Sequence, residues 1–151
     1  MRVLTLAALA WLAADVATAQ AAEPILSGEG SWNLRKSIDP TTNTPACVMT
    51  PKQRSRVQVE RDRLVVTGLP RRSIFNFQYR IDDEPASTPI SPTDAMQDTG
   101  AVSLEGAVFD RILSGKRFRI RILDTWHEAV TEDVDLAGLG GLHRTMIEAC
   151  R

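Results

Sequence analysis

The chain has 151 residues, of which 18 are Lys or Arg and 19 are Asp or Glu, so its formal net charge is −1. This balance excludes the strongly basic class of proteins that bind nucleic acid or acidic membranes through net charge alone. A chain of this length has room for one hydrophobic core, and we expect a single folded domain of about 130 residues.

The first residues, MRVLTLAALAWLAADVATAQAAEP, have the pattern of a secretory leader. Arg2 precedes an apolar run over residues 3–14, which is shorter than the roughly 20 residues that a membrane-spanning helix needs. Residues 17–19, Ala-Thr-Ala, then fit the small-x-small pattern that signal peptidase cleaves. We therefore expect a signal peptide over residues 1–19; the alternative is an N-terminal helix of a cytosolic protein.

Cleavage after Ala19, or as second choice after Ala21, would release an exported protein. No later stretch is apolar enough to anchor it in a membrane, so we expect it in the periplasm or outside the cell. We expect a linker over residues 20–30 and a β-rich domain over residues 31–151.

Export makes the two cysteines, Cys47 and Cys150, candidates for a disulfide, because oxidising compartments favour this bond. The bridge would enclose about 100 residues, a loop length for which the chain-entropy model gives ~4.7 kcal/mol of stabilisation. A zinc site is disfavoured, since the cysteines and histidines lack the close spacing of such sites, and there is no C-x-x-C redox motif. No metal and no cofactor are predicted.

Alternating apolar and polar residues predict strands in the first half of the domain. The predicted strands are residues 31–36, 46–49, 56–60 and 64–67, with a turn over 39–43 after the first. Charged residues 60–63 separate the last two strands, which we expect to form a hairpin.

The clearest strand is residues 75–81, FNFQYRI. Phe75, Phe77, Tyr79 and Ile81 are expected on one face, which is most simply part of the core. The alternative is that Phe75, Phe77 and Tyr79 form a binding face for a small ligand. Three prolines in the following segment, 85–100, predict a long surface loop with one short strand near residues 88–91.

The second half of the domain combines helical and strand patterns. Residues 107–113 have helical spacing and end at Ser114-Gly115. Residues 117–122 alternate three apolar side chains with Arg117, Arg119 and Arg121. A strand ends near residues 134–136, glycines at 138–141 form a turn, and Leu142, Met146 and Cys150 define one face of a final helix. The predicted fold is a mainly β, single-domain antiparallel β-sandwich-like fold with a short internal helix, a C-terminal helix and one disulfide.

Charge is segregated along the chain: residues 52–72 hold seven basic and two acidic side chains, and residues 82–110 hold seven acidic and no basic ones. Segregated charge can steer a partner, although such blocks more often face each other or surround turns. The predicted interaction residues are Asp82, Asp83, Glu84, Arg117, Arg119 and Arg121.

Motifs of catalysis are absent: there is no G-x-S-x-G, S-x-x-K or H-E-x-x-H, so no catalytic residue is predicted. His127 lies in an acidic stretch and is the one candidate for a hydrolase, against the simpler interpretation of a solvated histidine. We expect the ring of His143 to pack its edge against the sheet. Asp82-Asp83-Glu84 lacks EF-hand spacing and is more consistent with a turn than with a calcium site.

The leader, Trp32 at the start of the first strand, the strand end at residues 79–83 and the closing Leu136-Ala137-Gly138-Leu139 with its helix and cysteine resemble the invasion-associated locus B type of small exported bacterial proteins. One difference is that residues 33–38 lack a cysteine that members commonly carry there. The resemblance implies a β-sandwich-like fold, no catalytic site and a role in host-cell invasion or the envelope. We therefore expect a non-enzymatic protein that binds a protein partner in the envelope or on a host cell; the alternative is a small-ligand-binding periplasmic protein.

Overall fold

The structure, a computed structural model, describes residues 25–38 and 42–150. The predicted signal peptide with its cleavage sites and residues 39–41 of the predicted turn lie outside this range. The described elements are β1 (Ile25–Glu29), β2 (Trp32–Ile38), β3 (Pro45–Pro51), β4 (Val57–Val59), β5 (Arg63–Val66), β6 (Ile74–Ile81), α1 (Asp94–Thr99), β7 (Val102–Glu105), α2 (Ala107–Ser114), β8 (Arg117–Asp124), β9 (Ala129–Asp135) and α3 (Leu139–Ala149). None of the described helices is both long and apolar enough to cross a membrane.

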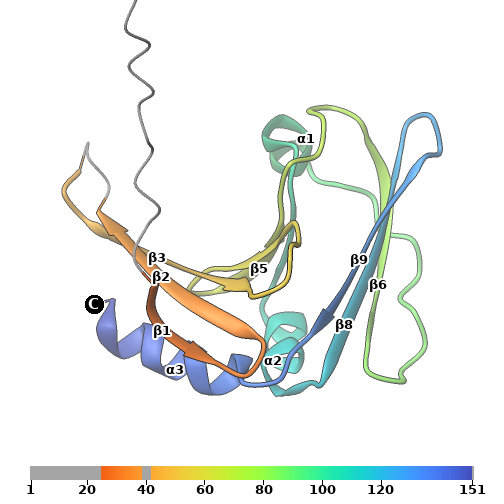
Figure 1. Cartoon of the computed structure of the whole chain (residues 1–151). Helices are drawn as coiled ribbons and strands as arrows, with labels where there is room; N and C mark the ends of the chain where they lie inside the picture. The colour runs from red at the N-terminus through yellow and green to blue at the C-terminus, as the bar shows by residue number, and fades with distance from the viewer. Residues whose placement is uncertain (1–24, 39–41, 151) are drawn as a thin grey trace, which may run out of the picture.

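The strands form two antiparallel sheets, which confirms the predicted mainly β, sandwich-like fold (Figure 1). One sheet has the order β1-β2-β3-β4-β5-β7, and the other has the order β6-β8-β9. Helix α3 packs on β1, β2, β3 and α2, at the end of the molecule where α2 lies. The hairpin between β8 and β9 and helix α1 lie at the opposite end (Figure 1).

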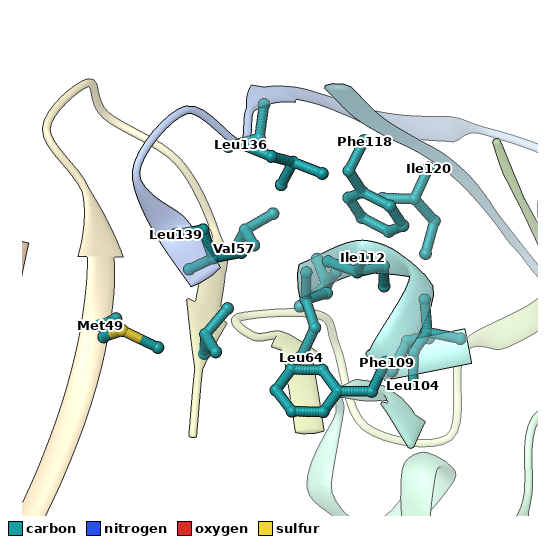
Figure 2. Close-up of a cluster of buried hydrophobic side chains, with 14 of the residues drawn as sticks. Met49, Val57, Leu64, Leu104, Phe109, Ile112, Phe118, Ile120, Leu136 and Leu139 are labelled. Atoms are coloured by element: carbon teal, nitrogen blue, oxygen red, sulfur yellow. The ribbon is translucent and has the colours of Figure 1, made fainter. Parts of the chain in front are cut away.

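The core draws apolar side chains from both sheets and from helices α2 and α3 (Figure 2). Phe118, Ile120 and Ile122 are each at most 2% exposed, which confirms the alternation predicted for β8. Phe109 and Ile112 of α2 lie among them, so the internal helix closes one end of the sandwich (Figure 2). Burial of this apolar surface is the main term that stabilises the fold.

Several segments differ from the sequence prediction. Val102–Glu105, where no strand was predicted, forms β7 and pairs with β5. Residues Ile25–Glu29, expected within the linker, form β1 and pair with β2. The proline-bearing loop 85–100 contains helix α1, whose first turn is capped when the Thr93 hydroxyl accepts a hydrogen bond from the Met96 N–H at 3.2 Å. Gly100, with φ of 63°, ends that helix in the left-handed conformation typical of a glycine C-cap. The short strand expected near residues 88–91 is reduced to one bridge between Phe77 and Ile90.

The prediction that Phe75 shares the inner face of β6 is wrong. Pairing of β6 with β8 shifts register between Ile74 and Asn76, so Phe75 occupies a β-bulge. Its side chain is 49% exposed, whereas Phe77 is 1% exposed. Phe77 therefore belongs to the core, and Phe75 belongs to the surface.

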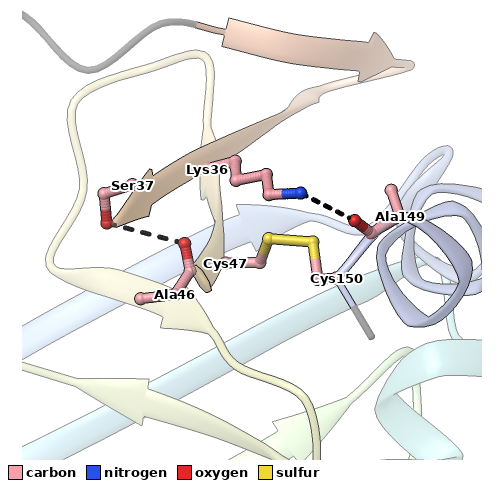
Figure 3. The surroundings of a disulfide bond; sticks show 6 residues. All are labelled: Lys36, Ser37, Ala46, Cys47, Ala149 and Cys150. Carbon is pink, nitrogen blue, oxygen red and sulfur yellow. Dashed lines mark hydrogen bonds between the residues drawn. A yellow bond between two sulfur atoms is a disulfide. The ribbon is translucent and has the colours of Figure 1, made fainter. Parts of the chain in front are cut away.

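The disulfide Cys47–Cys150 is present and joins β3 to the end of α3, with a Cα–Cα distance of 6.3 Å (Figure 3). Beside it the Lys36 ammonium group donates a hydrogen bond to the Ala149 carbonyl oxygen at 3.0 Å. A cation at a helix C-terminus also complements the helix dipole. The end of α3 is thus fixed to β2 and β3 by one covalent and one polar contact.

Helix α3 begins at Leu139, three residues before the apolar stripe from which it was predicted. The glycines predicted as a turn instead allow close packing: a Cβ at Gly140 would lie 2.7 Å from the Leu113 carbonyl oxygen. His143, expected to pack against the sheet, places its ring edge-on to Phe109 of α2, with ring centroids 5.5 Å apart. Its Nε2 atom lies 2.8 Å from the Arg61 carbonyl oxygen.

Candidate functional site

The three acidic residues predicted to face a partner each have a contact within the chain. The Asp82 carboxylate accepts hydrogen bonds from the backbone N–H groups of Lys116 (2.7 Å) and Arg117 (2.8 Å), which lower the pKa of Asp82. Asp83 lies 3.7 Å from Arg80, and Glu84 pairs with Arg111. Asp82 therefore fixes the turn into β8.

The predicted arginines lie on the outer face of the three-stranded sheet. Arg117 forms two hydrogen bonds of 2.7 Å to the Asp133 carboxylate, and Arg119 reaches the same carboxylate at 3.3 Å. Arg121 lies opposite Thr131 and has no ion pair among the residues that the structure describes. Much of this charge is thus neutralised between neighbouring strands of the sheet. The two charge blocks also contact each other, because Arg63 pairs with Glu105 and Arg72 pairs with Asp98. These pairs favour the simpler of the two interpretations of the blocks.

Asp135 connects the two sheets at the end near α2. Its carboxylate accepts hydrogen bonds from the Ser31 hydroxyl at 2.7 Å and from the Ala137 N–H at 2.9 Å, and its carbonyl oxygen accepts one from Trp32 Nε1 at 2.9 Å. The hydrogen bond from Ser31 is the main reason that the pKa of Asp135 is lowered. The hydrogen bond from Arg117 lowers the pKa of Asp133 in the same way.

Acid is expected to destabilise the fold through these carboxylates. Folding lowers the pKa of Asp82, Asp133 and Asp135 below 3.8, so the unfolded chain binds protons more readily. Their contribution is complete at pH values well above 3.8 and is lost as the pH falls through the lower values of the folded state. Urea unfolding from about pH 6 to about pH 3 should show this decline, and Asp133→Asn should flatten it. An unchanged pH profile in Asp133→Asn would contradict the role of the Arg117 pair.

The β8–β9 hairpin ends in a tight turn with two exposed aromatic rings nearby. The Asp124 carboxylate accepts hydrogen bonds from the N–H groups of Trp126 (2.9 Å) and Glu128 (2.8 Å), and the Asp124 carbonyl accepts one from His127 N–H at 3.0 Å. The Trp126 side chain is 72% exposed, and the exposed Phe75 contacts the His127 ring edge-to-face at 5.1 Å. We call Phe75, Trp126 and His127 the aromatic tip.

His127 has a φ of 65°, the left-handed conformation that this position of a three-residue hairpin loop requires and that glycine usually supplies. A residue with a Cβ is less stable there by roughly 1–2 kcal/mol. Its ring contacts Phe75 and forms no hydrogen bond or ion pair with a carboxylate of the described residues; the Asp124 carboxylate is used by backbone N–H groups. This geometry builds a rigid contact surface and does not couple His127 to a carboxylate.

A cavity of about 300 Å³ lies between the sheets below the hairpin. Leu69, Ile74, Ile122 and Val130 provide apolar walls, and Arg56 and Glu128 lie among its polar lining residues. The proposed ligand face of Phe75, Phe77 and Tyr79 does not line it: Phe77 is in the core and Phe75 lies in the aromatic tip.

The described residues contain no group of three or more His, Cys, Asp or Glu side chains that could hold a metal ion. Comparison with protein-family models, curated proteins and solved structures finds no match for this chain. Sequence reasoning did not select Trp126 as a contact residue. Its signal was an aromatic residue among polar neighbours shortly after the strand pattern of residues 117–122, a place where a turn can leave a side chain exposed.

Proposed function

We propose that this protein is an exported, non-enzymatic binding module of the bacterial periplasm or cell surface, which recognises a protein partner through the aromatic tip. The observation that carries this proposal is the 72% exposure of Trp126 beside Phe75, which is 49% exposed. Tryptophan is enriched among the residues that dominate binding energy at protein interfaces, and exposed apolar side chains that lie together mark interaction sites.

The rigidity of the tip supports the same role. Asp124 holds the turn through three hydrogen bonds, and the His127 ring contacts Phe75 edge-to-face. A preorganised surface binds with a smaller loss of conformational entropy than a mobile loop. The left-handed His127 adds to this support, since backbone strain is retained at functional positions when the surrounding structure enforces it.

Export is the second part of the proposal. The disulfide is compatible with an oxidising compartment, and the leader pattern of residues 1–19 agrees with it. The resemblance to the invasion-associated locus B type supports an accessory role in the envelope or in contact with a host cell. Native mass spectrometry of the protein from its own host would test export, because an intact leader or reduced thiols would contradict it.

Site-specific photo-crosslinking tests the binding role. A photoreactive phenylalanine analogue at position 126, in the full chain expressed in its own host, is expected to give a covalent adduct with a partner protein. Leu26, a large apolar side chain that is 49% exposed on β1, is the control position and should give none. Equal adducts at both positions, or none at 126, would contradict the proposal.

Substitutions at the tip should separate binding from stability. Trp126→Ala is expected to change the free energy of unfolding by no more than about 0.5 kcal/mol, because the side chain is exposed. His127→Gly should be neutral within about 1 kcal/mol, since relief of the left-handed conformation offsets the greater freedom of glycine in the unfolded chain. With the photoreactive analogue placed at position 75 instead of 126, both substitutions should reduce the yield of the adduct. A loss of stability of several kcal/mol in Trp126→Ala, measured by urea unfolding, would instead assign the ring a structural role.

The cavity of about 300 Å³ favours a second candidate, a small-ligand-binding periplasmic protein. A bound small molecule in the native mass of the protein from its host would favour this candidate. The hydrolase alternative has its own test, because His127→Ala would abolish turnover of an enzyme and would leave a structural turn intact.

A further inference from the structure

Strand β9 is the terminal strand of the three-stranded sheet, so one of its edges does not pair with a strand. Asp124 N–H donates to the Glu128 carbonyl, and Leu136 N–H donates to the Lys116 carbonyl, at the two ends of the β8–β9 pair. In an antiparallel pair, every second residue forms backbone hydrogen bonds to the partner strand. The backbone N–H and C=O groups of the residues between them point away from the partner strand. Ala129, Thr131, Asp133 and Asp135 therefore direct their backbone N–H and C=O groups to the open edge.

The half of this edge near α2 is covered by side chains from the other sheet. The Asp133 carbonyl oxygen accepts a hydrogen bond from Gln53 Nε2 at 3.3 Å, and the Asp135 carbonyl oxygen accepts one from Trp32 Nε1 at 2.9 Å. Val134, which points inward between these two residues, is 1% exposed. Here the two sheets close against each other.

The half near the hairpin is open. The outward N–H and C=O groups of Ala129 and Thr131 have no hydrogen-bond partner within the described parts of the chain. Val130 points inward like Val134 but is only partly buried, and it lines the cavity of about 300 Å³. Unpaired backbone groups thus lie directly beside a cavity with apolar walls and a partly polar lining.

The opposite edge of this sheet shows how the chain protects a strand. The segment after β6 returns along it: Ile90 N–H donates to the Phe77 carbonyl at 2.9 Å, and Ser87 N–H donates to the Tyr79 carbonyl at 2.8 Å. Exposed edges are templates for pairing and are normally covered or blocked in this way. The open half of β9 has neither a covering segment nor a proline.

We propose that an extended segment of the partner protein adds to β9 at Ala129 and Thr131 as a further strand and inserts an apolar side chain into the cavity lined by Val130. This inference rests on the proposed binding function and assigns its recognition mode. In strand addition, main-chain hydrogen bonds give affinity and a pocket for alternate side chains gives specificity.

Three features favour an extended protein segment over other occupants. A small ligand in the cavity would leave the backbone groups of the edge unpaired, whereas a strand pairs them. Arg56 and residues 68–70 form the facing wall of the same cavity, so the space suits one chain and not a second sheet. The aromatic tip follows directly at the end of the edge, so one partner can contact both.

Thr131→Pro tests the inference, because proline removes the outward N–H and is tolerated at an outward position of an edge strand. Thr131→Val is the matched control, since it changes the side chain and keeps the N–H. Each variant carries the photoreactive analogue at position 126 in its own host. The adduct is expected in the unsubstituted chain and in Thr131→Val, and it should fall roughly tenfold in Thr131→Pro, as the loss of one main-chain hydrogen bond predicts.

A full adduct in Thr131→Pro would overturn strand addition and leave the proposed binding role intact, whereas no adduct in any background would contradict both. An adduct with the mass of two copies of this chain would contradict a different partner protein and would show that the chain associates with itself. Val130→Trp, which fills the cavity without altering the backbone, is the second variant if Thr131→Pro does not fold. It should also reduce the adduct, and an undiminished adduct would contradict the insertion of a partner side chain into the cavity.

Discussion

Replacing both Cys47 and Cys150 with serine is expected to lower the free energy of unfolding by about 4–5 kcal/mol, the chain-entropy value for a loop of about 100 residues. The two cysteines are 103 residues apart, so the bridge constrains most of the domain in the unfolded chain. Because whole domains are stable by only about 5–15 kcal/mol, this loss is large enough to unfold part of the population. Urea unfolding of the oxidised protein and of the double variant measures it.

The native state should lose order at one place in the same variant. Helix α3 has 11 residues, a length that is marginal for an isolated helix. Without the disulfide, the hydrogen bond from Lys36 alone would hold the end of α3. Hydrogen exchange should therefore increase in the last turn of α3 before it increases in β8. Addition of a reductant to the double variant is the control and should have no effect. A loss below about 1 kcal/mol would show that the unfolded chain is already compact.

Much of the sandwich could be predicted because one face of each strand is buried. Phe118, Ile120 and Ile122 alternate with arginines, and this period of two survives in the structure as a buried and a solvent-facing row. The disulfide could be predicted because the sequence has two cysteines, which allow one pairing within the chain. In both cases a single physical constraint decides the outcome.

Features that depend on tertiary contacts could not be predicted. The bulge that turns Phe75 outward is a change of register between β6 and β8, and the alternating sequence of β6 carries no mark of it. Strand β1 has the sequence ILSGE, without a buried row, and it forms because β2 offers an edge. Helix α1 had usable signals in Thr93 and Gly100, but three prolines in the same segment favoured a loop.

The sequence prediction selected charged residues for an interaction site and did not select the aromatic tip or the β9 edge. Arg117 and Asp133 are 16 residues apart, and only the register of β8 with β9 shows that they neutralise each other. The open half of the β9 edge follows from strand order and from the side chains that cover the other half. Neither the Arg117–Asp133 pair nor the open half of the edge can be predicted from the sequence of a single strand.

The second large effect is expected at Trp32, which lies in the core with no exposed surface. Trp32→Ala should lower the free energy of unfolding by about 3–5 kcal/mol, the range for removal of a large buried aromatic side chain. The indole joins the two sheets, because its ring packs in the core and its N–H donates to the Asp135 carbonyl at 2.9 Å. Urea unfolding at constant pH, with equal slopes for both proteins, measures the loss.

Trp32→Phe separates packing from the hydrogen bond. Phenylalanine keeps most of the apolar volume but leaves the Asp135 carbonyl without its donor, so a smaller loss of about 1–3 kcal/mol is expected. Equal losses in the two variants would assign the whole effect to the hydrogen bond. The same substitution removes one of the two side chains that cover the closed half of the β9 edge, so Trp32→Phe should also increase hydrogen exchange near Asp135. It should leave residues 129–131 unchanged, because no side chain of the described residues bonds to their outward backbone groups.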